Sequence, residues 1–404
     1  MSAWVDDGGI TSPLGFSAGG VAAGIKTYGP EPRYDVGLLV ADRPSVAVGL
    51  FTTNLICGAP VSISREHLQR GTARAIVINS GCSNVGLGER GLRDAREMTS
   101  LAARRLGIDA AHVLVASTGV IGRPLPLERI RHGIESIQIS REGGHDFSRA
   151  IMTTDRVAKR RALRVDVAGK TYTLGGSVKG SGMAAPNMAT VLGFLTTDAT
   201  LDQSWARATL KEVADRSLNM LNVDMDTSTS DSLFWLANGA AGGSPIDAKH
   251  PASQPLKDAC LALCIELTKD LARDGEGANA LLEVEVLGAA SLEDARRAAQ
   301  TIVSSPLVKS MVTGRDPNIG RVLMAVGRSG AAVDPARIRI VVNGLDAYTA
   351  GAEVDPDSYD ALRKSMDAAE VRISVHLGLG DQRATAWGCD LTEEYVRINA
   401  SYTT

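Results

Sequence analysis

Residues 179–198 combine residue types that could do chemistry together. The first half, residues 180–187, has the glycines, proline and asparagine of a loop. The second half, residues 191–195, has the β-branched and aromatic residues of a buried strand. Thr190 stands at the junction, directly after the small residue Ala189.

A threonine hydroxyl held against the preceding carbonyl can attack it and cleave the chain. The new N-terminal threonine would carry a nucleophile and its own base, because a free α-amino group titrates near pH ~8. Cleavage between Ala189 and Thr190 is therefore one hypothesis for this run. The simpler interpretation, that Thr190 is an ordinary strand residue, stays open because threonine is common in strands.

Attack on a carbonyl also needs donors that meet the negative charge on its oxygen, and losing one such donor commonly lowers the rate ~10²–10³-fold. Thr118 and Gly119 directly follow a predicted strand. A threonine hydroxyl beside a glycine amide could supply two donors. The same residues also fit an ordinary turn after a strand.

Two charged residues have surroundings that suit substrate binding. Lys179 precedes a glycine-rich loop and could hold a carboxylate as a point charge. Glu276 lies between Gly275 and Gly277, so it is poorly screened by its neighbours and could meet an ammonium group. Each residue also has a simpler interpretation, as a solvated surface lysine and as part of a helix-ending turn.

Periodicity predicts the elements that position these residues. Strands are expected over residues 73–79 and 112–117, with an amphipathic helix over 88–106 between them that stops at Gly107. The other predicted elements of this part are paired strands at 36–41 and 45–52, a hairpin of 161–167 and 172–178, and helices at 125–137, 201–221 and 251–273.

The order of elements changes from residue 281 to strand, helix, strand, helix, strand. Ser291 and Asp294 open the first of these helices in the manner of a capping box. The predicted elements are residues 281–287, 291–304, 337–342, 356–366 and 370–376. This order is typical of a separate α/β domain.

Composition limits the function classes. A net charge of −3, 22% charged residues and no long apolar run give no reason to expect nucleic-acid or membrane binding. The first residues lack a basic stretch followed by an apolar core, so we expect a cytoplasmic protein. The five cysteines are scattered and are expected to be reduced thiols. The six histidines show no metal-ligand spacing, so no metal site is predicted.

Residues 179–198 closely resemble the self-cleavage segment of the ornithine acetyltransferase family. That family makes acetylglutamate in arginine biosynthesis and belongs with the N-terminal-nucleophile enzymes. Further segments look like family signatures and occur in the family's order, over nearly the whole chain. These segments are residues 117–122, 151–155, 226–229, 274–277, 305–309 and 395–399.

The resemblance implies an αββα sandwich of the N-terminal-nucleophile type, with a smaller C-terminal α/β domain. We expect the sandwich core and cleavage site in residues 1–195, the continuation of the core and the substrate pocket in 196–280, and the C-terminal domain in 281–404. The resemblance also implies that the two cleaved chains stay associated as an α₂β₂ heterotetramer, with no metal or obligatory cofactor.

By the same resemblance, Thr190 is the nucleophile, Ala189 and Thr190 flank the cleaved bond, and Thr118 and Gly119 stabilise the oxyanion. The residues expected to bind substrate are Thr153, Lys179, Thr190, Glu276, Asn399 and Thr404. The implied reaction moves acetyl from N2-acetyl-L-ornithine to L-glutamate through an acetyl-Thr190 intermediate. Some family members also take acetyl-CoA as the donor.

The chain departs from the family's usual residues at three relevant positions. Arg156 stands where threonine is usual, Cys82 where asparagine is usual, and Ala280 where a lysine is usual. An extra cation at Arg156 is expected near the substrate entrance. The three departures together motivate an alternative function: a paralogue that acylates another amino acid in secondary metabolism. Two further alternatives are an N-terminal-nucleophile hydrolase or aminopeptidase, in which water takes the acyl group, and a non-catalytic binding protein.

Overall fold

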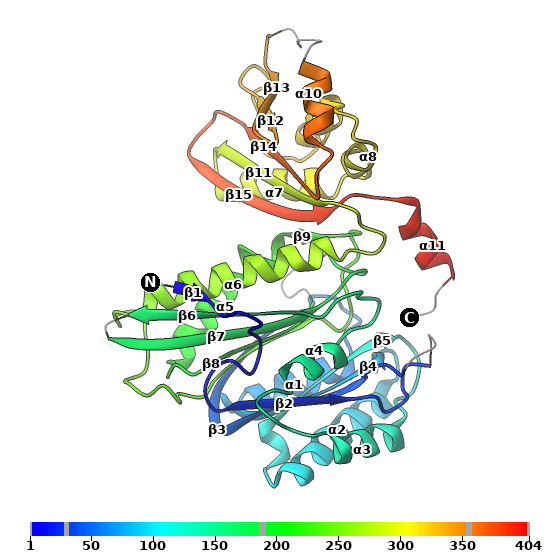
Figure 1. Cartoon of the computed structure of the whole chain (residues 1–404), viewed down its shortest axis with the longest axis vertical. Helices are drawn as coiled ribbons and strands as arrows, with labels where there is room; N and C mark the ends of the chain where they lie inside the picture. Colours follow the sequence, from blue (N-terminus) through cyan, green and yellow to red (C-terminus); the bar gives the residue numbers. More distant parts are fainter. Residues whose placement is uncertain (1, 28–31, 168, 186–190, 353–357, 402–404) are drawn as a thin grey trace.

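The computed structural model describes residues 2–27, 32–167, 169–185, 191–352 and 358–401 (Figure 1). Three residues predicted for the site, Ala189, Thr190 and Thr404, lie outside these ranges.

The described strands form two sheets (Figure 1). The larger sheet has the order β1-β6-β7-β8-β10-β3-β4-β5, with β2 also paired to β3. Its strands are β1 (Ser2–Trp4), β2 (Phe16–Val21), β3 (Val36–Phe51), β4 (Thr72–Cys82), β5 (Val113–Val120), β6 (Lys159–Val167), β7 (Lys170–Lys179), β8 (Leu192–Thr197) and β10 (Ser232–Ala237). The smaller sheet, in the order β13-β12-β14-β11-β15-β9, contains β9 (Leu221–Asn222), β11 (Leu281–Ala289), β12 (Arg339–Val342), β13 (Leu345–Thr349), β14 (Glu370–His376) and β15 (Gln382–Cys389).

The long strand β3 belongs to both halves of the larger sheet. Residues 36–40 pair with β4, and residues 46–51 pair with β10. The register with β4 shifts between Val40 and Ser45. Pro44 can lie within this irregularity because it has no N–H to donate to a neighbouring strand. The prediction of two paired strands at 36–41 and 45–52 is therefore wrong, because the irregularity interrupts one strand without reversing it.

Alternating side chains show that the larger sheet folds over itself into two layers. Ile76 and Ile78 of β4 share one apolar cluster with Phe194 of β8 and Phe234 of β10, so the two halves face each other. The residues between them along each strand, such as Val77, belong to clusters with the helices on the outer faces. The resulting helix–sheet–sheet–helix order confirms the predicted αββα sandwich.

Helices cover both outer faces of the sandwich (Figure 1). α1 and α2 contact β5, whereas α5 contacts β3 and α6 contacts β6 and β7. The short helix α4 lies between the layers and contacts strands of both halves. The bounds are α1 (Ala59–Leu68), α2 (Gly88–Leu106), α3 (Leu127–Ser136), α4 (Gly144–Ala150), α5 (Gln203–Asp215) and α6 (Ser253–Arg273). α2 has the predicted bounds, and Gly107 ends it with a φ of +66°.

The smaller sheet and its helices lie above the sandwich in Figure 1. These helices are α7 (Leu292–Val303), α8 (Pro306–Gly314), α9 (Ile319–Gly327) and α10 (Ser358–Ser365). β9 reaches this sheet from earlier in the chain and pairs with β15. The prediction of one helix over 201–221 is wrong, because α5 ends at Asp215 and the chain then turns toward β15. The division of the chain into three domains stays a prediction.

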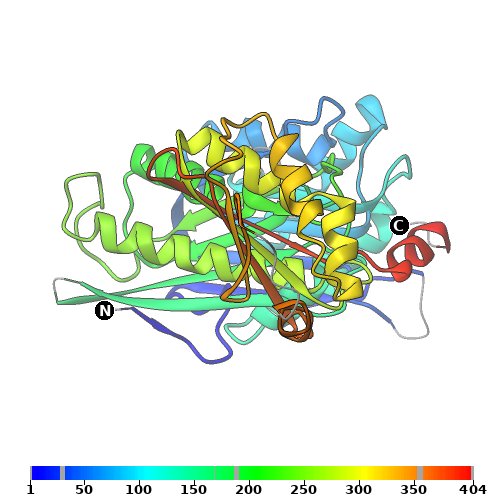
Figure 2. The same cartoon turned by 90° about the horizontal axis from the view of Figure 1, so that it is seen from above.

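The last helix, α11 (Glu393–Ser401), returns from the smaller sheet to the sandwich (Figures 1 and 2). β1 and α11 lie at opposite sides of the molecule in both views. Thr392 Oγ1, just before α11, donates to the Gly277 carbonyl at 2.7 Å. This contact attaches α11 to the turn that follows α6, and so brings Asn399 to the sandwich from the far end of the chain.

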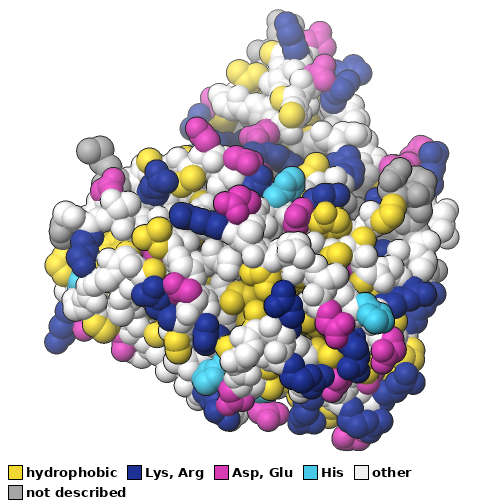
Figure 3. All heavy atoms as spheres, turned by 60° about the horizontal axis from the view of Figure 1, so that its bottom comes forward, with side chains coloured by type: hydrophobic (Ala, Val, Ile, Leu, Met, Phe, Trp, Pro, Cys, Tyr) yellow, Lys and Arg dark blue, Asp and Glu magenta, His cyan; other side chains and the backbone are white. Residues whose placement is uncertain are grey.

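The surface shown in Figure 3 has charges of mixed sign. Lys and Arg side chains are interspersed with Asp and Glu, and hydrophobic side chains form small groups on this face. No helix in the described ranges is long and apolar enough to cross a membrane.

Candidate active site

A cavity of about 110 Å³ lies where several strand ends of the sandwich meet. Residues at the ends of β5 and β7, before β10, after α6 and in α11 line it. Six residues predicted for the site are among them: Thr118, Gly119, Thr153, Lys179, Glu276 and Asn399. Val191, which follows Thr190 directly in the chain, lines the same cavity.

Strand pairing explains why these distant residues meet. β7 runs antiparallel to β8, and Lys179 at the end of β7 is paired with Leu192 at the start of β8. β8 runs parallel to β10, and the Ser232 N–H donates to the Val191 carbonyl at 3.2 Å. Val191 therefore lies beside the end of β7, and the residues just before β10 lie on the other side of Val191.

Thr118 and Gly119 lie near the end of β5. Gly119 has a φ of +123° and is paired with Gly81 of β4. A Cβ atom on Gly119 would collide with the Gly81 carbonyl carbon and lie 2.7 Å from the Cys82 nitrogen, so this position needs glycine. Thr118 Oγ1 accepts a hydrogen bond from Lys179 Nζ at 3.2 Å, and a hydroxyl that accepts can still donate its own hydrogen.

Lys179 places a cation on the cavity wall. Burial lowers the pKa of Lys179, while the charges of Asp155 and Asp231 act in the opposite direction. A substrate carboxylate at this position would favour the charged amine in the same way. Binding of an anion and protonation of Lys179 are therefore coupled.

Glu276 and Asn399 bring two far-apart segments together in the cavity. Asn399 Nδ2 donates to Glu276 Oε2 at 2.7 Å, and the Glu276 N–H donates to the Ser181 carbonyl at 2.8 Å. A Cβ atom on Gly182 would lie 2.6 Å from Glu276 Oε1. The missing side chain of Gly182 thus makes the space that the carboxylate occupies.

The cavity wall contains a carboxyl group that sequence reasoning missed. Asp231 is 5% exposed, and its Oδ2 has no hydrogen-bond partner among the described residues. Burial raises the pKa of Asp231 to about 8, although Lys179 and hydrogen bonds from Ser228 favour the charged form. Its position directly before the entirely buried strand β10 is the signal that could have identified it.

Asp231→Asn is expected to reduce the dependence of folding stability on pH. The pKa of Asp231 rises from 3.8 to about 8 on folding, so the stability associated with its proton is full below about pH 4 and is lost as the pH rises through about 8. The amide of the variant has no such proton to lose. The Tm of Asp231→Asn should therefore fall less than the Tm of the wild type when the pH is raised from about 5 to about 9. Thermal melts in which the two proteins change in parallel would contradict this role of Asp231.

None of the three departures from the family pattern is among the described residues that line the cavity. The Arg156 N–H and Nε each donate to the Asp274 carboxylate at 3.0 Å, which holds this cation beside α6. Cys82 pairs with the strand that carries Thr118, and burial raises the pKa of its thiol. The Ala280 N–H donates at 3.1 Å to the carboxylate that directly follows β15.

Ala189 and Thr190 lie between two described ranges, the first of which ends at residue 185 and the second of which begins at residue 191. Thr404 follows the last described range. Both flanks of this interval are anchored by backbone hydrogen bonds. The Ala185 N–H donates to the Asp226 carbonyl at 3.0 Å, and the Val191 carbonyl accepts from β10.

Within the described ranges, no group of three or more His, Cys, Asp or Glu residues could hold a metal ion.

Comparisons with known proteins agree on one family. The model of the ArgJ family matches residues 17–404. Relatives named arginine biosynthesis bifunctional protein ArgJ include that of Dehalococcoides mccartyi, 46% identical over 98% of both chains. Another, from Symbiobacterium thermophilum, is 48% identical over 98% of this chain and 99% of its own.

Two solved structures carry related names. The arginine biosynthesis bifunctional protein argJ of Bacillus halodurans is 39% identical, covers 47% of this chain and 98% of its own, and superposes with a TM-score of 0.45. The ornithine acetyltransferase of Mycobacterium tuberculosis, complexed with ornithine, is 34% identical, covers 47% of this chain and 100% of its own, and has a TM-score of 0.43. Because the family model matches residues 17–404 and the relatives are 46% and 48% identical over nearly their whole length, the chain belongs to the ArgJ family.

Proposed function

We propose that the chain is a self-cleaving acetyltransferase of arginine biosynthesis, which moves acetyl from N2-acetyl-L-ornithine to L-glutamate through an acetyl-Thr190 intermediate. The observation that carries the proposal is one cavity that Thr118, Gly119 and Lys179 share with Val191. Because Val191 is bonded to Thr190, the residue next to the proposed nucleophile lines the site together with the groups that acyl transfer needs.

Cleavage is the first proposed step. Thr190 Oγ1 attacks the Ala189 carbonyl carbon, the peptide C–N bond breaks, and the hydroxyl proton passes to the departing nitrogen. Water then hydrolyses the resulting ester, which leaves Ala189 with a carboxylate and Thr190 with a free amine. Thr118 and Gly119 supply the donors for the oxyanion that forms in each attack.

Acetyl transfer then uses the same hydroxyl. The Thr190 amine takes the hydroxyl proton as Oγ1 attacks the acetyl carbonyl of acetylornithine, and this proton passes to the departing ornithine amine. The neutral amine of glutamate attacks the acetyl ester, and the Thr190 hydroxyl is restored as acetylglutamate leaves. One amide replaces another, so the reaction needs no ATP, metal or obligatory cofactor. Acetyl-CoA could load the same hydroxyl as a second donor.

The charged residues of the cavity suit amino-acid substrates. Lys179 pairs with the carboxylate that both substrates carry, as a point charge. Glu276, held by Asn399, accepts an ammonium group of the substrate. Thr153 lines the same cavity, and Thr404 is proposed to complete the set.

The two fragments are expected to stay together after cleavage. β7, before the cut, pairs with β8, after it, along residues 174–179 and 192–197. Both fragments also contribute buried side chains to the cluster between the two sheet layers. We propose an α₂β₂ assembly of these fragments, located in the cytoplasm.

Products formed from acetylornithine test the proposed reaction. With glutamate present, acetylglutamate should form with ping-pong kinetics, seen as parallel lines in double-reciprocal plots. Equally fast release of acetate with and without glutamate would instead indicate a hydrolase. Turnover of another amine acceptor, but not of ornithine or glutamate, would indicate the paralogue with a different substrate.

A further inference from the structure

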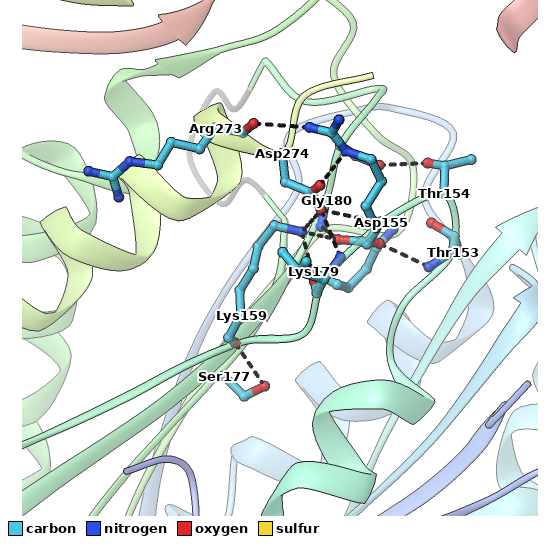
Figure 4. Close-up of polar contacts among 12 residues, drawn as sticks. Thr153, Thr154, Asp155, Lys159, Ser177, Lys179, Gly180, Arg273 and Asp274 are labelled. Atoms are coloured by element: carbon cyan, nitrogen blue, oxygen red, sulfur yellow. Dashed lines mark hydrogen bonds and ion pairs between the residues drawn. The ribbon is translucent and has the colours of Figure 1, made fainter. Parts of the chain in front are cut away.

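A buried ion cluster lies next to the cavity wall (Figure 4). Lys159, at the start of β6, has a side chain that is 1% exposed. Its Nζ lies 2.6 Å from Asp155 Oδ1 and 2.6 Å from Asp274 Oδ2, and both carboxylate side chains are buried as well. A single ammonium group therefore bridges the loop after α4 and the residue that ends α6.

Asp155 holds two segments of the cavity wall. Its Oδ2 accepts the Thr153 N–H at 2.9 Å, and its Oδ1 accepts the Gly180 N–H at 2.8 Å (Figure 4). Thr153 and Gly180 both line the cavity, and Gly180 is bonded to Lys179. The placement of Thr153 and Lys179 thus depends on one carboxylate.

Asp274 fixes a third segment. It ends α6 two residues before Glu276, in the turn that carries this side chain to the cavity. Its carboxylate also accepts the Arg156 N–H and the Arg156 Nε–H, each at 3.0 Å. Since Arg156 follows Asp155 directly, Arg156 and Lys159 tie the same loop to the end of α6.

The charges within the cluster balance, with Lys159 and Arg156 against two carboxylates. Burial would raise the pKa of Asp155, but Lys159 and Lys179 outweigh burial and hold this pKa below its usual value. Burial would lower the pKa of Lys159, but Asp155 and Asp274 outweigh it, so this pKa is raised. Removing Lys159 would leave a buried carboxylate without its partner, which is strongly destabilising.

We propose that Lys159 is a positioning residue for acetyl transfer, which sets the relative placement of the segments that carry Thr153, Lys179 and Glu276. The inference rests on the proposed function, in which these three residues bind the substrates. Lys159 does not line the cavity and acts through the two carboxylates that it bridges. Misplacing such groups by about 1 Å can lower the rate about 10²-fold.

Lys159→Met tests the proposal. If this variant fails to fold, the double variant Lys159→Met/Asp155→Asn replaces it, because the double variant does not leave the charge of Asp155 without its partner. Arg161→Met is the matched control. Arg161 lies two residues after Lys159 in β6, and its Nε lies 2.6 Å from Asp270 Oδ2. Asp270 belongs to α6, the helix that Asp274 follows, but it lies further from the cavity than Asp274. Both Lys159 variants should raise the KM values of acetylornithine and glutamate about 10- to 10²-fold, with a smaller change in kcat. Arg161→Met should keep the wild-type KM values and the wild-type kcat. Lys159→Arg should recover part of the loss.

Hydrogen–deuterium exchange gives a readout that does not depend on turnover. The Thr153 and Gly180 amides should exchange faster in both Lys159 variants than in the wild type, and should stay slow in Arg161→Met. Wild-type KM values and wild-type exchange in the folded double variant would overturn the inference. A wild-type protein that turns over neither substrate would overturn the proposed function instead, and the exchange comparison would still decide whether Lys159 fixes these segments.

Discussion

Replacing Thr190 by alanine is expected to abolish both cleavage of the chain and acetyl transfer. The variant has no hydroxyl to attack the Ala189 carbonyl, so it should remain a single chain of 42.4 kDa. Removing a catalytic nucleophile can lower kcat on the order of 10⁶-fold, and a loss of that order is expected here. Intact mass and acetylglutamate formation, measured on one preparation, report the two effects separately.

Thr190→Ser is the matched control, because it keeps a hydroxyl on the same main-chain position. It should cleave and retain part of the activity. If Thr190→Ala still gave two fragments that meet at Ala189 and Thr190, another group would have to cleave the chain. Unchanged activity of Thr190→Ala would exclude the acetyl-Thr190 intermediate, and a binding protein without catalysis predicts no effect of this variant at all.

Gly119→Ala is expected to give the second largest loss, about 10²–10³-fold in kcat/KM. The added Cβ atom would collide with the Gly81 backbone and lie 2.7 Å from the Cys82 nitrogen. Because both contacts are to the backbone of the paired strand β4, neither can rotate away, and the Gly119 amide must move from its place beside Thr118. Steady-state kinetics at a temperature where the variant is folded measure this loss.

Gly122→Ala separates the collision from the strain of a left-handed backbone. Gly122 lies just beyond the end of β5 with a φ of +81°, and nothing lies within 4 Å of an added Cβ atom. Both alanine variants carry the cost of about 1–2 kcal/mol for a left-handed residue, but only Gly119→Ala should lose activity. Equal activity losses in the two variants would mean that the strain of a left-handed residue, and not the collision with β4, causes the loss.

Residue types and spacing marked four residues of the cavity wall as candidates. Thr118 and Gly119 follow a predicted strand, Lys179 precedes a glycine-rich loop, and Glu276 sits between two glycines. Each position also had a simpler interpretation from local sequence, and the family resemblance implied its role. The roles of Asn399 and Thr404 came from the family resemblance, since a residue near the end of a chain has no pattern that shows where the chain returns. The structure places Asn399 beside Glu276 through α11.

The features that the sequence did not predict depend on pairing and burial between distant segments. Asp231 is one acidic residue in a polar run, and only its place beside β8 and Lys179 makes it a buried wall residue. Lys159 lies just outside the family-like segment 151–155, and it contacts Asp274, which is 115 positions away in the chain. The missed helices α8 and α9 are short, and apolar runs of such length do not distinguish a helix from a strand.

The acetylated enzyme gives the most direct test of the central claim. Purified protein is incubated with acetylornithine in the absence of glutamate, quenched in acid, and analysed by intact mass under denaturing conditions. The expected result is two fragments that meet at Ala189 and Thr190, with the fragment that begins at Thr190 heavier by one acetyl group. Addition of glutamate before the quench should remove that acetyl group. A single chain of 42.4 kDa, or a Thr190 fragment that never gains acetyl, would contradict the proposed mechanism.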